Sequence, residues 1–438
     1  MLPRLRVCQP LGIANPRHRR LPIRDTADCQ SALQLPALPS SSRPGNGSRL
    51  DFHSPRPKLS RAMAKVAQLL AELIAIPSVN NAFLPARHPH AGEGRVAEYL
   101  AALGAKAGLD IAFQTVLPHR PNVFVRLQPT GKIRQTILLA PHLDTVNVVS
   151  DAQLKPVKRG GRIYGRGACD TKGSVAVMFQ ALCDLAARKQ RPSETEIIFV
   201  GLVDEEHGQA GSRHLAERKF KADLAIVGEP TRLEIATAHK GSVWLEVETH
   251  GRAAHGATPW FGDNAAHSMA RVVEALQTDY AAQLKKKKHP LLGHGTVSVG
   301  TIHGGTQPNI VPDSCLIGVD RRTLPGESEA GTRQAMSAFL KARQLNATVS
   351  NVKLKPCPAL ETDARLPLVR QFLQQAGQKR ATGLHYFCDA AVLAGGGIPS
   401  VVFGPGDIAQ AHTADEWVEI SQLEQGCAKL LAFLKSLP

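Results

Sequence analysis

The sequence predicts an α/β protein whose first domain is interrupted by a second, smaller α+β domain. Apolar runs of strand length alternate with helical periods from residue 63 onward, the order of elements changes near residue 242, and the first pattern returns after residue 355. A chain of 438 residues is also longer than one hydrophobic core usually needs. We therefore expect a discontinuous domain over residues 63–241 and 355–438, with a mixed sheet flanked by helices, and an inserted domain over residues 242–354.

The first domain opens with a helical period that begins at Met63, where apolar residues recur every three or four positions. Strands are expected wherever a short apolar run is bounded by polar residues or glycine. The expected order is strands at Val123–Leu127 and Thr136–Ala140, a helix at Lys172–Arg188 and strands at Glu196–Val203 and Leu224–Val227, with the alternation resuming over Leu366–Gln375, Ser400–Phe403 and Ile420–Leu434.

The inserted segment has a different order of elements. We expect strand, helix, strand, strand, helix and strand, which is the split β-α-β order of a ferredoxin-like domain. Such a unit is compact and can stand alone. Its expected elements are Val243–Val247, Asn264–Leu276, Gly295–Ile302, Ser314–Val319, Glu327–Arg343 and Ala347–Leu354.

Residues 1–62 differ from the rest of the chain in composition. They are rich in Pro, Ser and Arg, and eleven Lys and Arg side chains against three Asp account for half of the formal net charge of +16. Because no apolar period persists there, we expect a disordered basic extension; an organellar transit peptide is the alternative, although prolines would interrupt its helix. The basic run Lys285–Lys288 is expected to be a solvated loop. The location of the charge therefore argues against nucleic acid as a partner of the folded body.

The cysteines and the hydropathy bear on the compartment. Eight cysteines are scattered along the chain without a Cys-x-x-Cys pair, which argues against a disulfide framework and favours a reducing, cytoplasmic compartment. No apolar stretch approaches the length of a membrane span, and the first residues do not resemble a secretory signal. We therefore expect neither membrane association nor secretion.

The candidate functional residues follow the strands of the first domain, where open α/β sheets place their ligands. His142 and Asp144 come directly after an apolar strand. Alternation along the chain places both side chains on one face, so that the imidazole can bind a metal ion while the carboxylate supports it. Taken alone, such a pair is more often an ordinary hydrogen-bonded loop, so the prediction depends on other segments.

Four further segments bring acids or an imidazole to comparable positions. Asp170 lies in a glycine-rich turn before a helix, which it could equally cap. Glu205 and Glu206 follow a buried strand as adjacent acids, which repel each other unless a cation is near. Glu229 and His412 follow two more strand ends, where a plain loop glutamate is the alternative for the former. Ligand types at five strand ends are too many for helix caps and solvent-exposed loops to explain.

The residue types indicate the ion and the reaction. Two histidines and three carboxylates suit zinc, with cobalt as an alternative, and exceed the needs of one tetrahedral site. We therefore expect two divalent ions bridged by Asp170. Two ions about 3.5–4 Å apart activate a water and polarise a carbonyl oxygen, as amide hydrolysis requires. Glu205 is expected to stay off the ions and to act as the general base.

These segments resemble the family of co-catalytic zinc amidohydrolases that includes acetylornithine deacetylase, succinyl-diaminopimelate desuccinylase, aminoacylase and glutamate carboxypeptidase. The resemblance extends over nearly all of the chain after Met63. It implies His142 and Glu229 on one ion, Glu206 and His412 on the other, Asp170 between them, Asp144 orienting His142, and Glu205 as the base.

The inserted segment resembles the lid and dimerisation domain of that family through Gly251–Pro259. The resemblance implies a homodimer in which His255 reaches the active site of the partner subunit and stabilises the oxyanion. On sequence alone, His255 is an ordinary loop histidine. Arg322 matches a position that binds the substrate carboxylate, and Arg321 would serve instead if the register slips by one. Asn309 would contact the carbonyl group.

The stretches 404–416 and 320–326 look most like acetylornithine deacetylases. This likeness implies hydrolysis of N-acetyl-L-ornithine to ornithine and acetate, a reaction of amino-acid biosynthesis; succinyl-diaminopimelate, other N-acyl amino acids and dipeptides are alternative substrates. Asn147, where many relatives have proline, and the triple glycine at 395–397 depart from the family pattern and bear on the pocket. A catalytically silent metal-binding scaffold is the alternative from another class, and the presence of Glu205 argues against it.

Overall fold

The structure is a computed structural model that describes residues 63–188, 191–352 and 355–438. The predicted disordered extension over residues 1–62 therefore lies outside the described residues, as does the end of the predicted strand Ala347–Leu354. Among the helices that the structure describes, none is both long and apolar enough to span a membrane.

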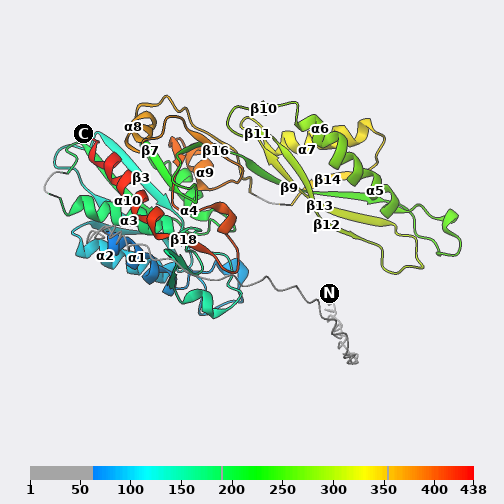
Figure 1. Ribbon diagram of the computed structural model, residues 1–438. Coiled ribbons are helices and arrows are strands. Elements are labelled where there is room, and N and C mark those ends of the chain that lie inside the picture. The colour runs from blue at the N-terminus through cyan, green and yellow to red at the C-terminus, as the bar shows by residue number, and fades with distance from the viewer. Residues whose placement is uncertain (1–62, 189–190, 353–354) are drawn as a thin grey trace, which may run out of the picture. The chain divides into compact units, whose positions relative to one another are not determined.

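A mixed sheet of nine strands organises the first domain (Figure 1). The strand order is β1-β2-β6-β3-β7-β17-β8-β15, and β16 pairs with β8. The four central strands β6, β3, β7 and β17 are parallel to one another, whereas β1, β2 and β15 pair in the antiparallel sense. The strands are β1 Asp110–Leu117, β2 Arg120–Leu127, β3 Gln135–Pro141, β6 Thr195–Gly201, β7 Leu224–Gly228, β8 Ala236–His239, β15 Leu360–Glu361, β16 Thr382–Leu384 and β17 Ser400–Val402.

Helices cover both faces of this sheet. Alternate residues of each central strand point to opposite faces and are buried on both, so Ile137 and Leu139 join one core while Leu138 and Ala140 join the other. The first core is completed by α1 Met63–Ala75, α2 Gly94–Lys106, α3 Lys172–Ala186, α8 Pro367–Gln375 and α10 Ile420–Lys435, and the second by α4 Ala210–Glu217 and α9 Asp389–Gly395. The predicted mixed sheet flanked by helices is confirmed.

The inserted segment forms a separate four-stranded antiparallel sheet with the order β12-β13-β9-β14. The burial of β13 alternates at every residue because one face packs on helices and the other does not. The elements are β9 Gly241–His250, α5 Ala265–Ala275, a π-helical turn Leu276–Tyr280, α6 Ala281–Leu284, β12 Thr296–Gly304, β13 Ser314–Thr323, α7 Glu329–Ala342 and β14 Thr348–Asn351. This order confirms the ferredoxin-like prediction.

Several short elements were not predicted. A three-stranded sheet pairs β18 with β5 and β5 with β4, and it brings a segment near the C-terminus beside the turn that precedes α3. The side chains of Lys285–Lys288 are exposed, as expected; the first three residues lie between α6 and the hairpin β10–β11, whereas Lys288, expected in the loop, begins β10. The short elements are η1 Asn81–Phe83, η2 Asp151–Leu154, β4 Val157–Arg159, β5 Arg162–Tyr164, η3 Pro259–Phe261, β10 Lys288–His289, β11 Gly293–His294, η5 Ile408–Gln410 and β18 Trp417–Glu419.

Candidate metal centre

Four parallel strands of the central sheet deliver candidate residues to one edge. The chain runs from β3 into His142, from β6 into Asp204–Glu206, and from β7 into Glu229. His412 lies further on, beyond η5 in the loop that follows β17. Because these four strands are parallel, their carboxyl ends meet at the same edge of the sheet. Side chains that are far apart in the sequence thereby become neighbours.

Asp170 lies between two histidines. Its Oδ1 atom is 3.2 Å from Nε2 of His142, and its Oδ2 atom is 3.3 Å from Nε2 of His412. Each histidine nitrogen also faces a glutamate. Glu229 Oε1 lies 3.7 Å from the first, and Glu206 Oε2 lies 3.2 Å from the second. One carboxylate therefore presents one oxygen to each of two histidine–glutamate pairs.

Asp170 reaches this position from an unexpected place. We expected it to follow a strand of the central sheet. It lies instead between β5 of the small sheet and α3. It does not cap α3 either, because the N-cap residue is Thr171. Glu416 holds the turn, since its carboxylate accepts hydrogen bonds from the backbone N–H groups of Gly167, Cys169 and Asp170 at 2.8–3.0 Å. The Asp170 carboxylate is thus left to face the histidines.

Asp144 supports the cluster in two ways. Its backbone oxygen is 3.0 Å from Nδ1 of His142, and its carboxylate oxygen Oδ1 is 3.4 Å from the same nitrogen. The carboxylate also accepts hydrogen bonds from the backbone N–H groups of Glu205 at 3.1 Å and Glu206 at 3.0 Å. Asp144 therefore contacts both the imidazole and the turn that carries the two glutamates, and the sequence predicts only the first contact.

The acids of the cluster lie beside one another, buried or half-buried. Burial, reinforced by the charge of Asp170, raises the pKa of Glu206 to about 7. Burial also raises the pKa values of Glu205 and Glu229. Burial acts in the same direction on Asp170, but hydrogen bonds from both histidines outweigh it and lower its pKa. Hydrogen bonds to the carboxylates of Asp170 and Glu206 raise the pKa of His412 to about 10. A cation would stabilise such a set of crowded carboxylates.

The residues present fit divalent metal ions. The buried Oε1 atom of Glu206 has no hydrogen-bond partner among the described residues, and an unpaired buried oxygen is costly unless a ligand compensates it. Imidazole and carboxylate ligands together suit zinc and similar ions. Ligand atoms within 4.8 Å of one another come from His142, Glu205 and Glu229 in one group and from His142, Asp170 and Glu206 in a second. The geometry is that of two neighbouring cation sites, with Glu205 within reach of one of them.

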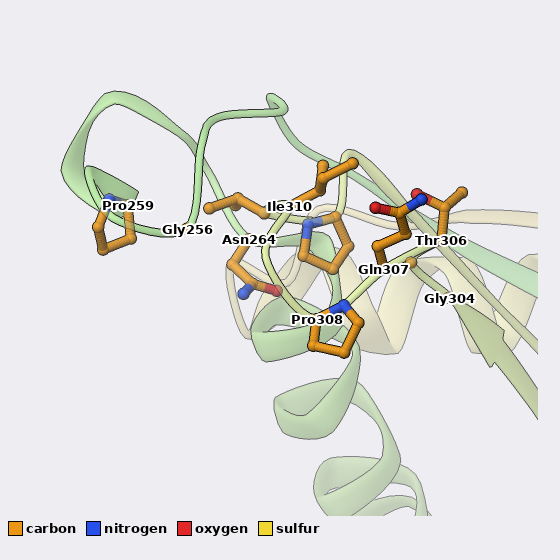
Figure 2. A pocket seen from close by; sticks show the side chains of 11 residues that line it. Gly256, Pro259, Asn264, Gly304, Thr306, Gln307, Pro308 and Ile310 are labelled. Carbon is orange, nitrogen blue, oxygen red and sulfur yellow. The ribbon is translucent and has the colours of Figure 1, made fainter.

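Two candidates of the inserted domain lie in neighbouring loops. His255 is exposed, and its Nδ1 atom accepts a hydrogen bond from the backbone N–H of Ala257 at 3.1 Å. The backbone N–H of Gly256 donates to the backbone oxygen of Asn309 at 2.7 Å, so the loops lie side by side, as Gly256 and Ile310 show in Figure 2. Within the described ranges, no hydrogen bond or ion pair connects His255 or Asn309 to the metal centre.

The two adjacent arginines of β13 have different surroundings. Arg321 points to the helix-covered face, where its side chain is 2% exposed and its Nη2 atom lies 3.1 Å from Oε1 of Glu327. Arg322 points to the opposite face, where its Nη2 atom lies 2.9 Å from Oδ2 of Asp320 and its guanidinium lies over the ring of Phe387. Only Arg322 has an exposure that allows contact with a substrate, so the geometry favours it over Arg321.

Sequence reasoning missed the residues that surround these candidates. Arg120 forms two hydrogen bonds of 2.6 Å with Glu93, and both side chains are buried. Asp389 is also buried, where it accepts a hydrogen bond from Ser212, and burial raises its pKa to about 7. None of these residues belongs to a recognisable motif. The one local signal is Asp204, which precedes the glutamate pair as a third consecutive acid.

The chain is similar to known hydrolases over most of its length. Residues 138–436 match peptidase family M20/M25/M40. The acetylornithine deacetylase of Vibrio cholerae is 32% identical over 335 residues, which cover 74% of this chain and 85% of that protein. Aminopeptidase PepT of Bacillus cereus has a TM-score of 0.67 at 22% identity, and the dinuclear metal-binding peptidase YxeP of Bacillus subtilis has 0.62 at 13%; each comparison covers 85% of this chain and 98% of the other. The two solved structures support the fold.

Proposed function

Because the chain belongs to peptidase family M20/M25/M40, we propose that it is a two-metal amidohydrolase that cleaves the amide bond of an N-acyl amino acid. The observation that carries this proposal is the position of Asp170, with one carboxylate oxygen toward His142 and the other toward His412. A bridging carboxylate flanked by two histidine–glutamate pairs supplies ligands for a pair of ions that share one residue.

We assign His142 and Glu229 to one ion and Glu206 and His412 to the other, with Asp170 between them. Zinc is the proposed metal and cobalt the alternative, because the ligands are imidazole and carboxylate. When bound, the two ions would polarise the scissile carbonyl group and lower the pKa of a water molecule.

Glu205 is the proposed general base. Burial raises its pKa, and a carboxyl group with a raised pKa is suited to take a proton from water and to pass it to the leaving nitrogen. Its backbone N–H is held by the Asp144 carboxylate at 3.1 Å, so the side chain is carried by a fixed turn. The proposed proton transfers thus depend on one side chain whose backbone is fixed before substrate arrives.

The inserted domain, residues 242–354, is proposed to act as a lid and a dimerisation domain beside the discontinuous catalytic domain, residues 63–241 and 355–438. In this proposal, His255 of one protomer stabilises the oxyanion in the active site of its partner. Arg322 binds a substrate carboxylate, and Asn309 contacts the carbonyl group. The exposure of His255 and Asn309 supports the proposal, because both side chains are accessible to a second molecule.

N-acetyl-L-ornithine is the proposed substrate, since the curated relative from Vibrio cholerae carries the name acetylornithine deacetylase. Succinyl-diaminopimelate, other N-acyl amino acids and dipeptides are the alternatives within the family. We further propose a cytoplasmic location, on the scattered spacing of the cysteines. Cell fractionation with an antibody against the protein tests the location.

A substrate panel tests the activity. Zinc-loaded and cobalt-loaded protein are incubated with N-acetyl-L-ornithine, N-succinyl-diaminopimelate, neutral N-acetyl amino acids and dipeptides, and amine release is followed. We expect the fastest release from N-acetyl-L-ornithine and none after chelation of the metal. Release from another member of the panel would reassign the substrate, and no release from any member would overturn the proposed reaction.

A further inference from the structure

The buried side chains of Asn80, Glu93 and Arg120 hold the turn that carries Glu205 and Glu206. The turn begins at Asp204, whose φ of 70° lies in the left-handed region that residues with a Cβ atom rarely adopt. The backbone oxygen of Asp204 accepts a hydrogen bond from the N–H of Gly208 at 3.0 Å. This backbone conformation turns the chain so that the next two N–H groups reach the carboxylate of Asp144.

The Asp204 side chain is fixed by residues from the segment before β3. Its Oδ1 atom accepts hydrogen bonds from Nη2 of Arg120 and from Nδ2 of Asn80, both at 3.0 Å. Its backbone N–H donates to Oε1 of Glu93 at 3.1 Å. Glu93 in turn accepts two hydrogen bonds of 2.6 Å from Nε and Nη2 of Arg120. We call these four residues, Asn80, Glu93, Arg120 and Asp204, the Arg120 network.

The Arg120 network also contacts the metal centre directly. Asn80 donates a second hydrogen bond from Nδ2 to Oδ2 of Asp144 at 2.7 Å, so one amide group connects the two aspartates. All members of the network are 6% exposed or less. The guanidinium of Arg120 is the cation that faces Glu93 and Asp204, and without it two buried carboxylates would lie together unpaired.

We propose that Arg120 is a positioning residue for hydrolysis: it holds Asp204, and through it the peptide units of Glu205 and Glu206, where both glutamates face the metal ions. This inference rests on the proposed function. None of the four residues is assigned to the metal ions or to the substrate, so the effect of the network is on geometry. Displacement of a reacting group by about 1 Å is enough to cost roughly 100-fold in rate.

Arg120→Lys is the first test, because lysine keeps the positive charge and cannot form the planar fork of hydrogen bonds. The expected result is a kcat lower by about 10-fold to 100-fold, a KM close to that of the wild type, and weaker binding of one of two ions in calorimetric titration of the metal-free protein. Arg365→Lys is the matched control, since Arg365 makes the same fork with Asp363 but its side chain is 89% exposed.

Asp204→Gly is the second test, which remains informative if Arg120→Lys does not fold. Glycine accepts the positive φ and removes the carboxylate that Arg120 holds. Lys219→Gly is its control, because Lys219 is an exposed residue with a φ of 53°. We expect the visible spectrum of bound cobalt to change in Asp204→Gly and to remain as in the wild type in Lys219→Gly.

The outcomes separate this inference from the proposed function. Wild-type protein that binds no divalent ion would overturn the proposed function and this inference with it. Wild-type protein that binds two ions, together with Arg120→Lys and Asp204→Gly variants that match their controls in metal affinity and kcat, would overturn this inference alone. Equal fold-changes in kcat and KM that follow only a lower melting temperature would also overturn this inference, because they would indicate a purely structural role.

Discussion

The metal centre and the loops of the inserted domain contain candidate residues of two different kinds. At the metal centre, His142, Asp170 and Glu229 are each 7% exposed or less, and Nε2 of His142 lies 3.2 Å from Asp170 and 3.7 Å from Glu229. In the inserted domain, His255 and Asn309 are exposed. The fold itself holds the first group together, whereas the side chains of the second group are accessible to another molecule.

Because of this difference, substitutions in the two regions should affect stability and activity differently. A buried polar cluster is costly unless its members are paired, so the surrounding chain must hold it in place before any ligand binds. Glu416, Asp144 and the Arg120 network do this at the metal centre. Exposed loop residues contribute little to folding, so substitutions there should alter activity and leave stability almost unchanged.

The largest effect is expected from Glu205→Gln, which removes the proposed base. The variant keeps the shape of the side chain but cannot take a proton, so we expect kcat to fall by about 100-fold to 10,000-fold. Binding of two metal ions should persist, as measured by metal analysis of the purified variant. Retention of full activity would exclude Glu205 as the base and would leave the metal centre without an assigned proton acceptor.

His255→Ala should reduce kcat by about 100-fold to 1,000-fold, because it removes the imidazole that is proposed to donate to the oxyanion. The melting temperature should not change, since His255 is exposed and, within the described ranges, its side chain accepts a hydrogen bond only from the backbone N–H of Ala257, two positions along the chain. A loss of stability equal to the loss of activity would contradict the contrast between the two regions.

Mixing the two inactive variants tests whether the loops act across a dimer. If His255 completes the partner's site, a mixed dimer of Glu205→Gln and His255→Ala contains one site with both defects and one intact site. Activity should then return to at most about a quarter of the wild-type value after subunit exchange. If activity does not return although exchange is demonstrated by size or mass, the proposed contribution of the partner subunit is wrong.

The sequence predicts the metal centre better than its supports, and the reason is physical. His142, Glu206 and Glu229 each follow a buried strand, and parallel strands necessarily bring their carboxyl ends together. Asp170 was found from its glycine-rich turn, but its place outside the central sheet was not predictable, because it depends on the distant pairing of β5 with β18.

The Arg120 network illustrates what a local pattern cannot reveal. Asn80, Glu93 and Arg120 lie on three separate turns or element ends, and each has an ordinary neighbourhood in the sequence. Only the fold brings them to Asp204. Strand β1 was missed for a related reason: most of its side chains are not buried, so it has no continuous apolar run.

Arg322→Gln should raise KM for a substrate with a carboxylate by about 10-fold to 100-fold, because a hydrogen bond to a charged group is lost. The kcat should change little, since the guanidinium lies away from the scissile bond in this proposal. Arg321→Gln is the contrasting variant: it removes a buried cation from the partly buried Glu327, so it should lower the melting temperature. The reverse pattern in the two variants would show that the register assigned to β13 is wrong.

The smallest effect on activity at neutral pH is expected at His239, the last residue of β8, directly before the chain enters the inserted domain. Burial lowers the pKa of His239 to about 4, and its Nε2 atom has no hydrogen-bond partner among the described residues. The folded protein therefore holds His239 neutral, while the unfolded chain takes up a proton near pH 6.5.

Below pH 6.5 the unfolded state binds more protons than the folded state, so stability must fall as the pH is lowered toward 4. At about 1.4 kcal/mol for each pKa unit between 6.5 and 4, the contribution of His239 to this loss is on the order of 3 kcal/mol. Urea unfolding of the wild type and of His239→Gln between pH 7 and pH 4 measures this contribution. Glutamine does not titrate, and the contributions of all other groups cancel in the difference between the two free energies of unfolding. If the two proteins lose stability in parallel over this range, then protonation of His239 is not opposed by folding, and the junction before the inserted domain is less closely packed than the metal centre.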